Sequence, residues 1–456
     1  MLIYDTLAGE KVELEPREAG HVGLYVCGPT VYDVPHLGHA RSALSFDVIR
    51  RALEHRGLAV THVSNITDVD DKIINRARAE GTSEPEVAAR YEEAYWSTLD
   101  RLGVARPHHI PHATGYIAEM QELIARLLER GAAYVTDSGV YFAVESFPGY
   151  GALSHRRLDD LLESAGARVE VDETKRSPVD FALWKAAKPG EPAWDSPWGK
   201  GRPGWHIECS AMSVGLLGEG FDIHGGGDDL VFPHHENERA QSEGAGLGFA
   251  RHWLHNAMVV VSGEKMSKSL GNFTTLSEVL DTHDPRVLRL LVLQTHYRSA
   301  TEMGKANLDD AAAALGRLDA LVRRARAQIG AVPGEGGLDS AIKADFDAAL
   351  DDDFNTPAAL GAIFEAVRRA NAAIDAGHRT EAHQLVSTVR ILTGALGLEL
   401  DDGSGAAVDD EVADLVARRD AARRARDFAE ADRIRSELAG RGVILEDTPA
   451  GTIWHR

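Results

Sequence analysis

The sequence predicts an α/β protein in which a parallel-sheet domain, interrupted by an insertion, is followed by an α-helical bundle and a small C-terminal domain. Two patterns predict this class. Up to about residue 262, apolar runs of strand length alternate with amphipathic segments of helix length, which is typical of a parallel sheet covered by helices. From about Asn307 onward the pattern is helical to the end of the chain.

The first clear elements form a β-α-β unit. Strands are expected at His21–Gly28 and Leu58–Thr67, on either side of an amphipathic helix at Ala40–Gly57 that ends at its glycine. After a mixed region, residues 186–205 combine Pro, Gly and Trp without periodicity, as a surface loop does. This unit therefore begins a parallel sheet that an insertion then interrupts.

A second apolar unit follows the insertion, so the sheet is expected to resume. A helix is predicted at Trp205–Gly218, a strand running into a glycine loop at Phe221–Gly227, a helix at Asp229–Gly246 and a late strand at His252–Gly263. In the C-terminal half, one face of a long helix is expected to carry Leu308, Leu315, Leu318, Val322 and Ile329. Two breaks rich in glycine or acids, at 329–340 and 400–411, are linker candidates, and the second isolates a unit beginning near Val412.

Composition limits the possible functions. A chain of 456 residues suggests about two to four domains, and its net charge of −22 argues against a general polyanion binder. Between Arg418 and Arg441, however, eight arginines face five acids. This segment is either a solvated helix with internal ion pairs or a local contact for nucleic acid.

The chain carries no pattern of a secretory leader or a membrane span. Its first residues lack a basic stretch followed by an apolar one, and no window approaches about 18 uninterrupted apolar residues. We therefore expect a cytoplasmic protein without membrane contact. Cys27 and Cys209 are the two cysteines, so a disulfide framework is implausible, and a metal or catalytic role competes with plain burial.

A His-x-Gly-His motif follows the first strand, at the place where parallel sheets bind ligands. His36 and His39 lie at the carboxyl end of that strand, on one side of the first turn of the next helix. Gly38 allows a bulky ligand to approach the backbone. The pair suits the phosphates of a nucleotide, although the pattern is short and also fits two surface histidines near a helix cap.

A second motif, "SGEKMSKSLGNF", follows the late strand. Lys265 and Lys268 lie on this Gly- and Ser-rich segment, where a loop can bring two ammonium groups onto a triphosphate. By itself such a segment is usually just a loop. Together with the histidines, the lysines fit electrostatic stabilisation of an in-line attack at phosphorus.

A metal site is a further candidate. His234 and Glu238 are four residues apart on a predicted helix, so both side chains project from one face. Cys27 and Cys209 complete four ligands of the types that zinc accepts. The spacing alone also fits two buried cysteines and a solvated turn of helix.

The two phosphate motifs resemble the signatures of the class I aminoacyl-tRNA synthetases: "KMSKS" is complete, and "HLGH" departs only by Leu37 in place of isoleucine. Five further segments resemble the cysteinyl-tRNA synthetases over essentially the whole chain. They are "CGPTVYDVPHLGHARS", "NITDVDDKI", "GWHIECSAMS", "DIHGGGDDLVFPHHENERAQSE" and "GTIWHR".

The resemblance implies roles for particular residues. Zinc is expected on Cys27, Cys209, His234 and Glu238, with the substrate thiol as a further ligand. Catalysis is expected from His36, His39, Lys265 and Lys268, and ATP contacts from His36, Gly38, His39 and Lys268. The cysteine pocket is expected to contain Thr67, Trp205, His224 and Asp229, with Asp229 pairing with the ammonium group. For Trp205 and His224, core packing is nearly as probable as direct contact.

The implied activity is that of a cysteine–tRNA ligase. It uses ATP with Mg²⁺ to form cysteinyl-adenylate and passes the cysteinyl group to tRNA(Cys). Because zinc prefers a thiolate to a hydroxyl, no editing domain is expected. Two alternatives stay open: a cysteine ligase with an amino-sugar acceptor, as in the mycothiol pathway, and a catalytically inactive paralogue. We expect a monomer.

The implied domain organisation follows the breaks in the sequence. We expect the first half of a Rossmann-like catalytic domain at 1–111, an insertion at 112–199, the second half of the catalytic domain with the zinc site at 200–262, the KMSKS loop and a stem-contact region at 263–306, a helical bundle at 307–400, and a linker with a small tRNA-binding domain at 401–456.

Overall fold

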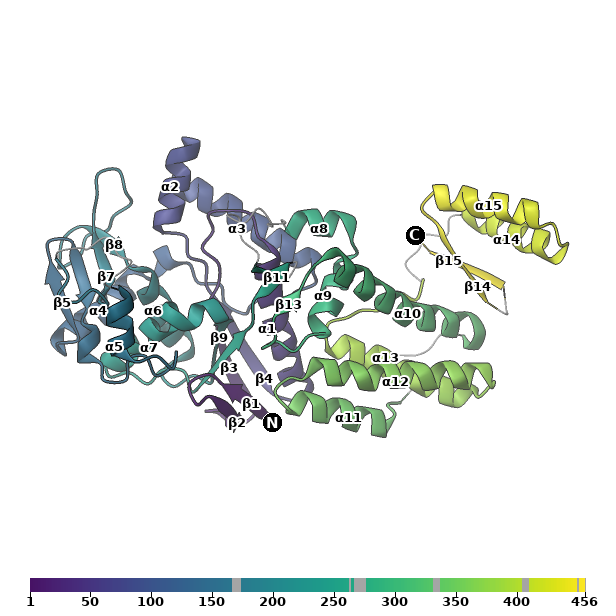
Figure 1. Cartoon of the computed structure of the whole chain (residues 1–456), viewed down its shortest axis with the longest axis horizontal. Coiled ribbons are helices and arrows are strands. Elements are labelled where there is room, and N and C mark those ends of the chain that lie inside the picture. The colour runs from purple at the N-terminus through teal and green to yellow at the C-terminus, as the bar shows by residue number, and fades with distance from the viewer. Residues whose placement is uncertain are drawn as a thin grey trace. The chain divides into compact units, whose positions relative to one another are not determined.

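The computed structural model describes residues 1–165, 174–261, 264–265, 276–330, 337–403, 410–448 and 451–455. Two compact units divide the chain (Figure 1): the first contains residues 1–305 and 350–355, and the second contains 306–349 and 356–456. Among the described residues, no helix is long and apolar enough to cross a membrane.

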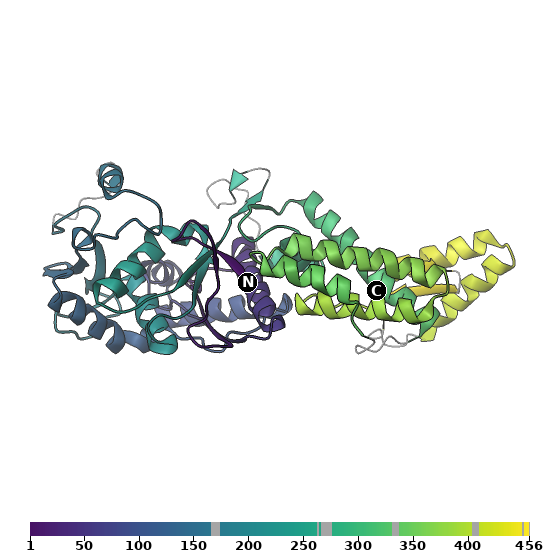
Figure 2. The ribbon, with the colours of Figure 1, turned by 90° about the horizontal axis from the view of Figure 1, so that it is seen from below.

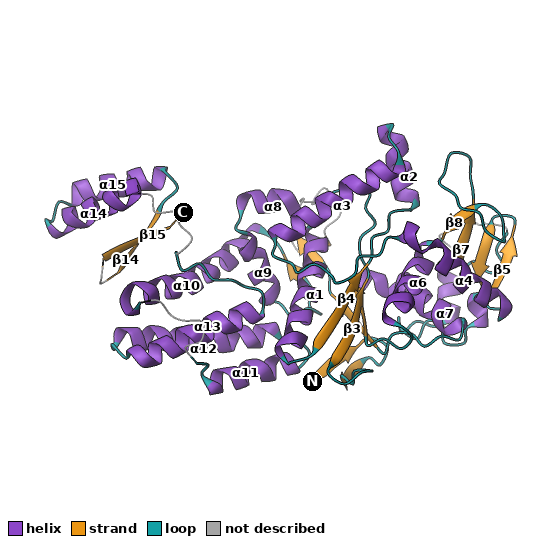
Figure 3. Ribbon diagram, turned by 180° about the vertical axis from the view of Figure 1, so that it is seen from behind, coloured by secondary structure: helices purple, strands orange, loops and turns teal. Residues whose placement is uncertain are grey.

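A parallel four-stranded sheet forms the centre of the first unit, as the alternating pattern predicted. Its order is β10 (His252–Asn256), β9 (Ile223–Gly227), β3 (His21–Val26) and β4 (Ala59–Ser64). Helix α1 (Leu37–His55) packs against β4, β9 and β10, and helix α6 (Trp205–Leu217) packs against β3 (Figure 3). The four strands run in the same direction, so their carboxyl ends meet at one edge of the sheet.

The insertion forms an antiparallel sheet of its own. Its strands, in order, are β5 (Ala133–Thr136), β6 (Gly139–Phe142), β7 (Phe181–Ala186) and β8 (Gly201–Pro203). Helix α4 (Ile117–Glu129) and helix α5 (Leu158–Ala165) accompany it. Its apolar core includes Phe142 and Trp184 and continues into Ile207 of α6, so the insertion is packed onto the part of the unit that holds the parallel sheet.

Two predicted elements of the second sheet half differ in detail. The late strand is divided between β10 of the main sheet and β11 (Val259–Val261), which pairs with β12 (Glu264–Lys265) and β13 (Thr301–Glu302). The helix expected from Asp229 begins at Glu236 and forms α7 (Glu236–Gly244). Before it, the backbone turns tightly, and Phe232 is extended, because the residue before a proline avoids helical dihedrals.

The remaining elements of the first unit frame the sheet. They are β1 (Leu2–Asp5), β2 (Glu10–Glu13), α2 (Asp71–Glu80), α3 (Glu84–Arg101), α8 (Leu276–Thr282) and α9 (Pro285–Leu293). Helix α3 packs on α2 and α8, and α9 packs on α1.

The second unit is mainly helical. Its long helices are α10 (Lys305–Ile329), α11 (Ser340–Asp351), α12 (Thr356–Asp375) and α13 (Arg379–Ala395), and Figure 2 shows them running alongside one another. The predicted apolar face of α10 is buried, as at Leu315 and Leu318.

The prediction of helices to the C-terminus is wrong at the last segment. Helices α14 (Asp410–Arg424) and α15 (Phe428–Gly440) precede an antiparallel hairpin of β14 (Ile444–Thr448) and β15 (Gly451–His455). Gly442 adopts φ 73°, a left-handed conformation that ends helical continuity, and the following Val443 and Ile444 favour a strand.

Candidate active site with a metal-ligand cluster

A cavity of about 450 Å³ opens at the carboxyl edge of the parallel sheet. Its wall combines the loop after β3, the first turns of α1, the end of β10 and the start of α6. Cys27, His36, His39, Trp205 and Asp229 all line it. Residues that the sequence assigned to a metal, to ATP and to the amino acid therefore border one space.

His36 and His39 hold the start of α1 with one ring nitrogen each. His36 is the N-cap residue, and its Nδ1 accepts a hydrogen bond from the backbone N–H of Gly38 at 3.1 Å. In return, Nδ1 of His39 accepts from the backbone N–H of His36 at 3.2 Å. The two rings stack with centroids 3.9 Å apart. Since both Nδ1 atoms accept, the proton of each neutral ring is on Nε2.

Burial keeps both rings neutral. It lowers the pKa of His39 to about 3, with a smaller contribution from His36, and it also lowers the pKa of His36, which Asp229 partly offsets. At neutral pH each ring is thus an N–H donor and not a cation. This arrangement suits hydrogen bonds to phosphate oxygens at a helix N-terminus.

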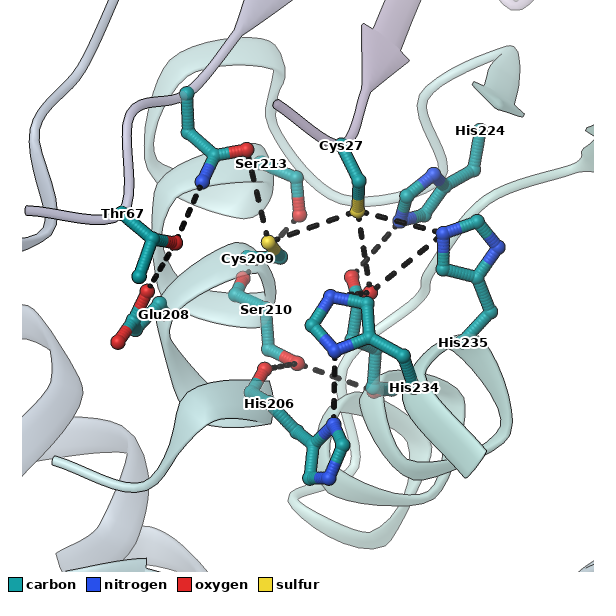
Figure 4. A network of polar contacts seen from close by, with 12 residues as sticks. Cys27, Thr67, His206, Glu208, Cys209, Ser210, Ser213, His224, His234 and His235 are labelled. Atoms are coloured by element: carbon teal, nitrogen blue, oxygen red, sulfur yellow. Dashed lines mark hydrogen bonds and ion pairs between the residues drawn. The ribbon is translucent and has the colours of Figure 1, made fainter. Parts of the chain in front are cut away.

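The four predicted metal ligands lie together (Figure 4), and one of them, Cys27, lines the cavity. Cys27 Sγ lies 3.6 Å from Cys209 Sγ and 3.4 Å from Glu238 Oε1, and His234 Nε2 lies 3.0 Å from the same Glu238 oxygen. One ligand atom of each of the four residues lies within 4.8 Å of those of the others. Cys27 follows β3, Cys209 belongs to α6 and Glu238 to α7.

These separations fit a tetrahedral zinc site. With Zn–S of about 2.3 Å and Zn–N or Zn–O of about 2.0–2.1 Å, two sulfurs are expected roughly 3.8 Å apart and the N and O atoms roughly 3.3 Å apart. Without a cation, burial raises the pKa of the Cys27 and Cys209 thiols, whereas a bound cation favours the thiolates. The ligand atoms of a second group also lie within 4.8 Å of one another. This group contains Cys27, His224, His235 and Glu238.

Three histidines surround the cluster: His224 and His235 are buried, and His206 is half-buried. The contacts are those of His206 Nδ1 with His234 Nδ1 (2.8 Å), of His224 Nε2 with Glu238 Oε2 (2.8 Å) and of His235 Nε2 with Cys27 Sγ (3.3 Å). Outer partners of this kind orient metal ligands. His206 and His235 were not expected from the sequence, since a histidine beside a motif residue carries no pattern of its own.

Of the four residues predicted for the cysteine pocket, two line the cavity and two do not. Trp205 and Asp229 line the cavity, and the centroids of the Trp205 and His234 rings lie 4.1 Å apart. Thr67 and His224 are buried behind the wall. Thr67 Oγ1 donates to Glu208 Oε2 at 2.7 Å, and His224 contacts Glu238, so these two are placed to act through neighbours.

Asn65 connects the metal cluster with the Thr67 side of the site. Its Oδ1 accepts from the backbone N–H of Gly28 at 2.9 Å and lies 3.7 Å from Cys209 Sγ, and its Nδ2 lies 3.4 Å from Thr67 Oγ1. Asn65 was not predicted as a site residue. The sequence signals were its place at the end of an apolar strand and at the start of the segment "NITDVDDKI".

The two lysines of the second motif are not placed. Lys265 belongs to β12, of which only the backbone is described, and Lys268 lies outside the described residues. Their roles stay predictions.

Three segments of the chain match family models. Residues 13–313 match the tRNA synthetases class I (C) catalytic domain, residues 345–401 a DALR domain, and residues 406–454 a cysteinyl-tRNA ligase anticodon binding domain. Curated relatives match over the whole chain. A cysteine–tRNA ligase of Alkalilimnicola ehrlichii is 52% identical, covering 100% of this chain and 99% of the relative. One of Trichlorobacter lovleyi is 49% identical and covers 99% of each chain.

Solved structures of low identity show the same fold. A methionyl-tRNA synthetase of Mycobacterium tuberculosis in complex with methionyl-adenylate superposes with a TM-score of 0.59 at 15% identity, over 83% of this chain and 90% of that one. A putative arginyl-tRNA synthetase of Campylobacter jejuni gives a TM-score of 0.56 at 13% identity, over 85% and 95%.

Proposed function

The chain belongs to the cysteine–tRNA ligases, a family of class I aminoacyl-tRNA synthetases, and we propose that the cavity described above activates L-cysteine with ATP and transfers it to tRNA(Cys). The observation that carries this proposal is the shared cavity. Cys27, which belongs to a cluster of two thiols, an imidazole and a carboxylate, lines the same space as two histidines at a helix N-terminus. One group selects a thiol and the other holds phosphates.

In the first step, a carboxylate oxygen of cysteine attacks the α-phosphorus of ATP. The bond from this phosphorus to the oxygen bridging to the β-phosphate breaks, and pyrophosphate leaves with the electron pair. The nucleophile is already an anion, so no general base is needed. His36 and His39 donate N–H groups from Nε2 to the phosphates, with Lys265 and Lys268 as the proposed cations and Mg²⁺ bound to ATP.

Cys27, Cys209, His234 and Glu238 are proposed to hold one zinc ion per chain. A zinc ion bound there supplies a borderline-soft Lewis acid that favours a thiolate over a serine hydroxyl. Trp205 and Asp229 line the adjoining wall, where Asp229 accepts hydrogen bonds from the substrate ammonium. Thr67, held by Glu208, and His224, held against Glu238, position the wall from behind.

In the second step, a hydroxyl oxygen of the terminal ribose of tRNA attacks the carbonyl carbon of the adenylate. The bond from this carbon to the phosphate oxygen breaks, AMP leaves with the electron pair, and the hydroxyl proton passes to solvent. The match of residues 406–454 to an anticodon binding domain favours tRNA as the acceptor over an amino sugar. The monomeric state, the cytoplasmic location and the domain boundaries stay predictions.

The test supplies the pure protein with ATP, Mg²⁺ and labelled cysteine, together with either total tRNA or glucosaminyl-inositol. We expect cysteine-dependent exchange of pyrophosphate into ATP, no such exchange with serine, and label on tRNA alone. Label on the sugar would assign the amino-sugar activity, and absence of exchange would indicate an inactive paralogue.

A further inference from the structure

Part of the cavity wall holds none of the groups assigned so far to cysteine or to the phosphates of ATP. We call it the side chamber; it is lined by His62 of β4, Tyr95, Trp96 and Leu99 of α3, and Val104 and Pro107 of the following segment. Cysteine and the phosphates of ATP are assigned to Cys27, Trp205 and Asp229 and to the α1 N-terminus. The side chamber lies beyond His39, whose ring meets Tyr95 edge-on with centroids 6.2 Å apart.

His62 is the polar group of the side chamber. Its exposed fraction is 7%, and neither ring nitrogen has a hydrogen-bond partner within the part of the chain that the structure describes. Burial lowers its pKa to about 3, with help from Arg50, so the ring is neutral. The ring therefore carries one donor and one acceptor without a partner among the described residues, beside a cavity that the residue lines, and burying both in this way costs free energy.

The rest of the side chamber is aromatic and apolar. The Tyr95 and Trp96 rings pack against each other with centroids 5.0 Å apart, and Leu99, Val104 and Pro107 complete the wall. Val104 and Pro107 are only half-buried, so the side chamber can be reached from solvent. Because the two ring nitrogens point in different directions, one ligand edge can bond to only one of them; flat heteroaromatic ligands with a donor or acceptor on their edge match such a site, and nucleobases have this chemistry.

The proposed reaction brings two nucleosides into one cavity. The adenosine of ATP is one, and the terminal nucleoside of the tRNA is the other, since its ribose must reach the adenylate carbonyl. A cation also borders this space: Lys72 Nζ lies 5.1 Å from the centre of the Tyr32 ring, and both residues line the cavity. An exposed ammonium there suits a backbone phosphate of a single-stranded RNA end.

We propose that the side chamber binds the terminal base of the tRNA acceptor end, with its edge on His62 and its faces against the Tyr95–Trp96 wall. The inference rests on the proposed function and deepens it. His62 is thus a binding residue of the transfer step and has no part in adenylate formation.

The test separates the two steps in the whole enzyme. Pyrophosphate exchange measures adenylation, and single-turnover transfer from preformed enzyme-bound cysteinyl-adenylate to saturating tRNA(Cys) measures the second step. We compare His62→Leu, which removes the ring nitrogens at similar volume, with His62→Gln, which keeps a donor and an acceptor. The matched control is His252→Leu, because His252 is also a buried histidine of the parallel sheet without ring partners among the described residues, yet it does not line the cavity.

We expect His62→Leu to slow transfer by about tenfold while exchange stays within about twofold of the unchanged enzyme. His62→Gln should recover part of the loss, and His252→Leu should leave transfer unchanged. A tRNA that ends in purine riboside, which lacks the 6-amino group, should be transferred more slowly than normal tRNA by the unchanged enzyme. His62→Leu should no longer distinguish the two acceptors, a loss that a merely structural role does not produce.

Three results would overturn the inference. If His62→Leu and His252→Leu transfer the cysteinyl group at the same rate, the side chamber holds solvent and not the base. An equal fall in exchange and transfer would place the base of ATP there. Preserved discrimination between the two acceptors in His62→Leu would separate His62 from the base edge. If the unchanged enzyme performs neither step, the proposed function itself fails, which is a distinct result.

Discussion

The two ring nitrogens of His36, and those of His39, have separate tasks. In each ring Nδ1 accepts a backbone N–H and fixes the first turn of α1, and the proton of the neutral ring is on Nε2. The spacing of the motif predicted that both rings would lie on one side of this turn. Their tautomer and their neutrality could not be predicted, because both depend on the burial that the folded sheet creates.

The metal cluster offers a sharp test at the level of one residue. Cys209→Ala removes a thiol from the proposed zinc set but leaves the second group, Cys27, His224, His235 and Glu238, intact. We expect the purified variant to fall from about one zinc per chain to below about 0.1, measured by atomic emission. Ser213→Ala, one turn further along α6, is the control and should keep its zinc.

Zinc retained at full occupancy by Cys209→Ala, together with zinc lost from His224→Ala, would assign the ion to the second group. The two sets share Cys27 and Glu238, so only the remaining ligands distinguish them. The sequence predicted the i,i+4 pair of His234 and Glu238, but the choice of partners 182 residues apart requires the folded chain.

A buried ion pair predicts how stability responds to acid. Asp47 and Arg289 are 2% and 1% exposed and lie 2.6 Å apart. Burial alone would raise the pKa of Asp47, but Arg289, Arg51 and the Ala105 N–H together lower it below its usual value. Since the folded pKa is lowered, the pair stabilises the fold above about pH 4 and loses this contribution as the pH falls through the folded pKa.

Arg289→Met should therefore reduce the free energy of unfolding at pH 7 by about 3 kcal/mol, because it removes one of the two cations that hold the buried Asp47 carboxylate. Urea titrations followed by tryptophan fluorescence report on this unit, which holds six of the seven tryptophans. The difference in unfolding free energy between Arg289→Met and the unchanged protein should become smaller below about pH 4. Arg101→Met, whose partner Asp281 is exposed, should change stability by about 0–1 kcal/mol. A pH-independent difference would contradict this account.

At the scale of elements, the two glycines of the segment "CGPTVYDVPHLGHARS" have different functions. A Cβ on Gly28 would lie 1.7 Å from the backbone oxygen of Asn65, so the chain after β3 can approach β4 only without a side chain. A Cβ on Gly38 would instead meet the His36 ring at 2.9 Å. The first contact involves two backbones, and the second involves a side chain that can rotate.

Gly28→Ala should destabilise the first unit by about 3 kcal/mol and lower its zinc content, because the β3 and β4 ends must separate beside Cys27. Gly38→Ala should change stability by less than about 1 kcal/mol and raise KM for ATP in the exchange assay, because the His36 ring is displaced. Equal unfolding free energies for the two variants would show that the β3–β4 approach is not constrained as described.

Elements defined by local interactions could be predicted from the sequence, and elements defined by pairing with distant segments could not. Helix α1 and the strands before and after it were predicted, because their periodicity and caps are local. The β14–β15 hairpin was missed, because the Arg-rich helical pattern before it was extended past Gly440 and Gly442. Strand β8 was assigned to a loop: it is only three residues long and is recognisable by its pairing with β7.

At the scale of the whole molecule, the charge of −22 requires that tRNA be bound by local cations. The arginines of the C-terminal segment divide into two groups. Arg419 is 4% exposed and pairs with Asp447, and Arg433 pairs with Glu430 and Glu437, so these stabilise the small domain. Arg424, Arg426 and Arg435 have no acidic partner among the described residues and are the cations that remain for RNA.

The C-terminal domain has its own apolar core, so it can be removed without exposing part of another core. Val412, Leu415, Ile434, Leu438 and Val443 pack with one another, so a chain that ends before Val412 loses this core as a whole. Deleting Val412–Arg456 should leave cysteine-dependent pyrophosphate exchange within about twofold and lower kcat/KM for tRNA charging by about 100-fold or more, since only the acceptor loses contacts.

The Arg424→Ala, Arg426→Ala double variant should weaken charging less, and should reduce its dependence on salt by about one to two released ions. Charging by the truncated enzyme at the unchanged rate would exclude the domain from tRNA recognition and return the amino-sugar acceptor to consideration.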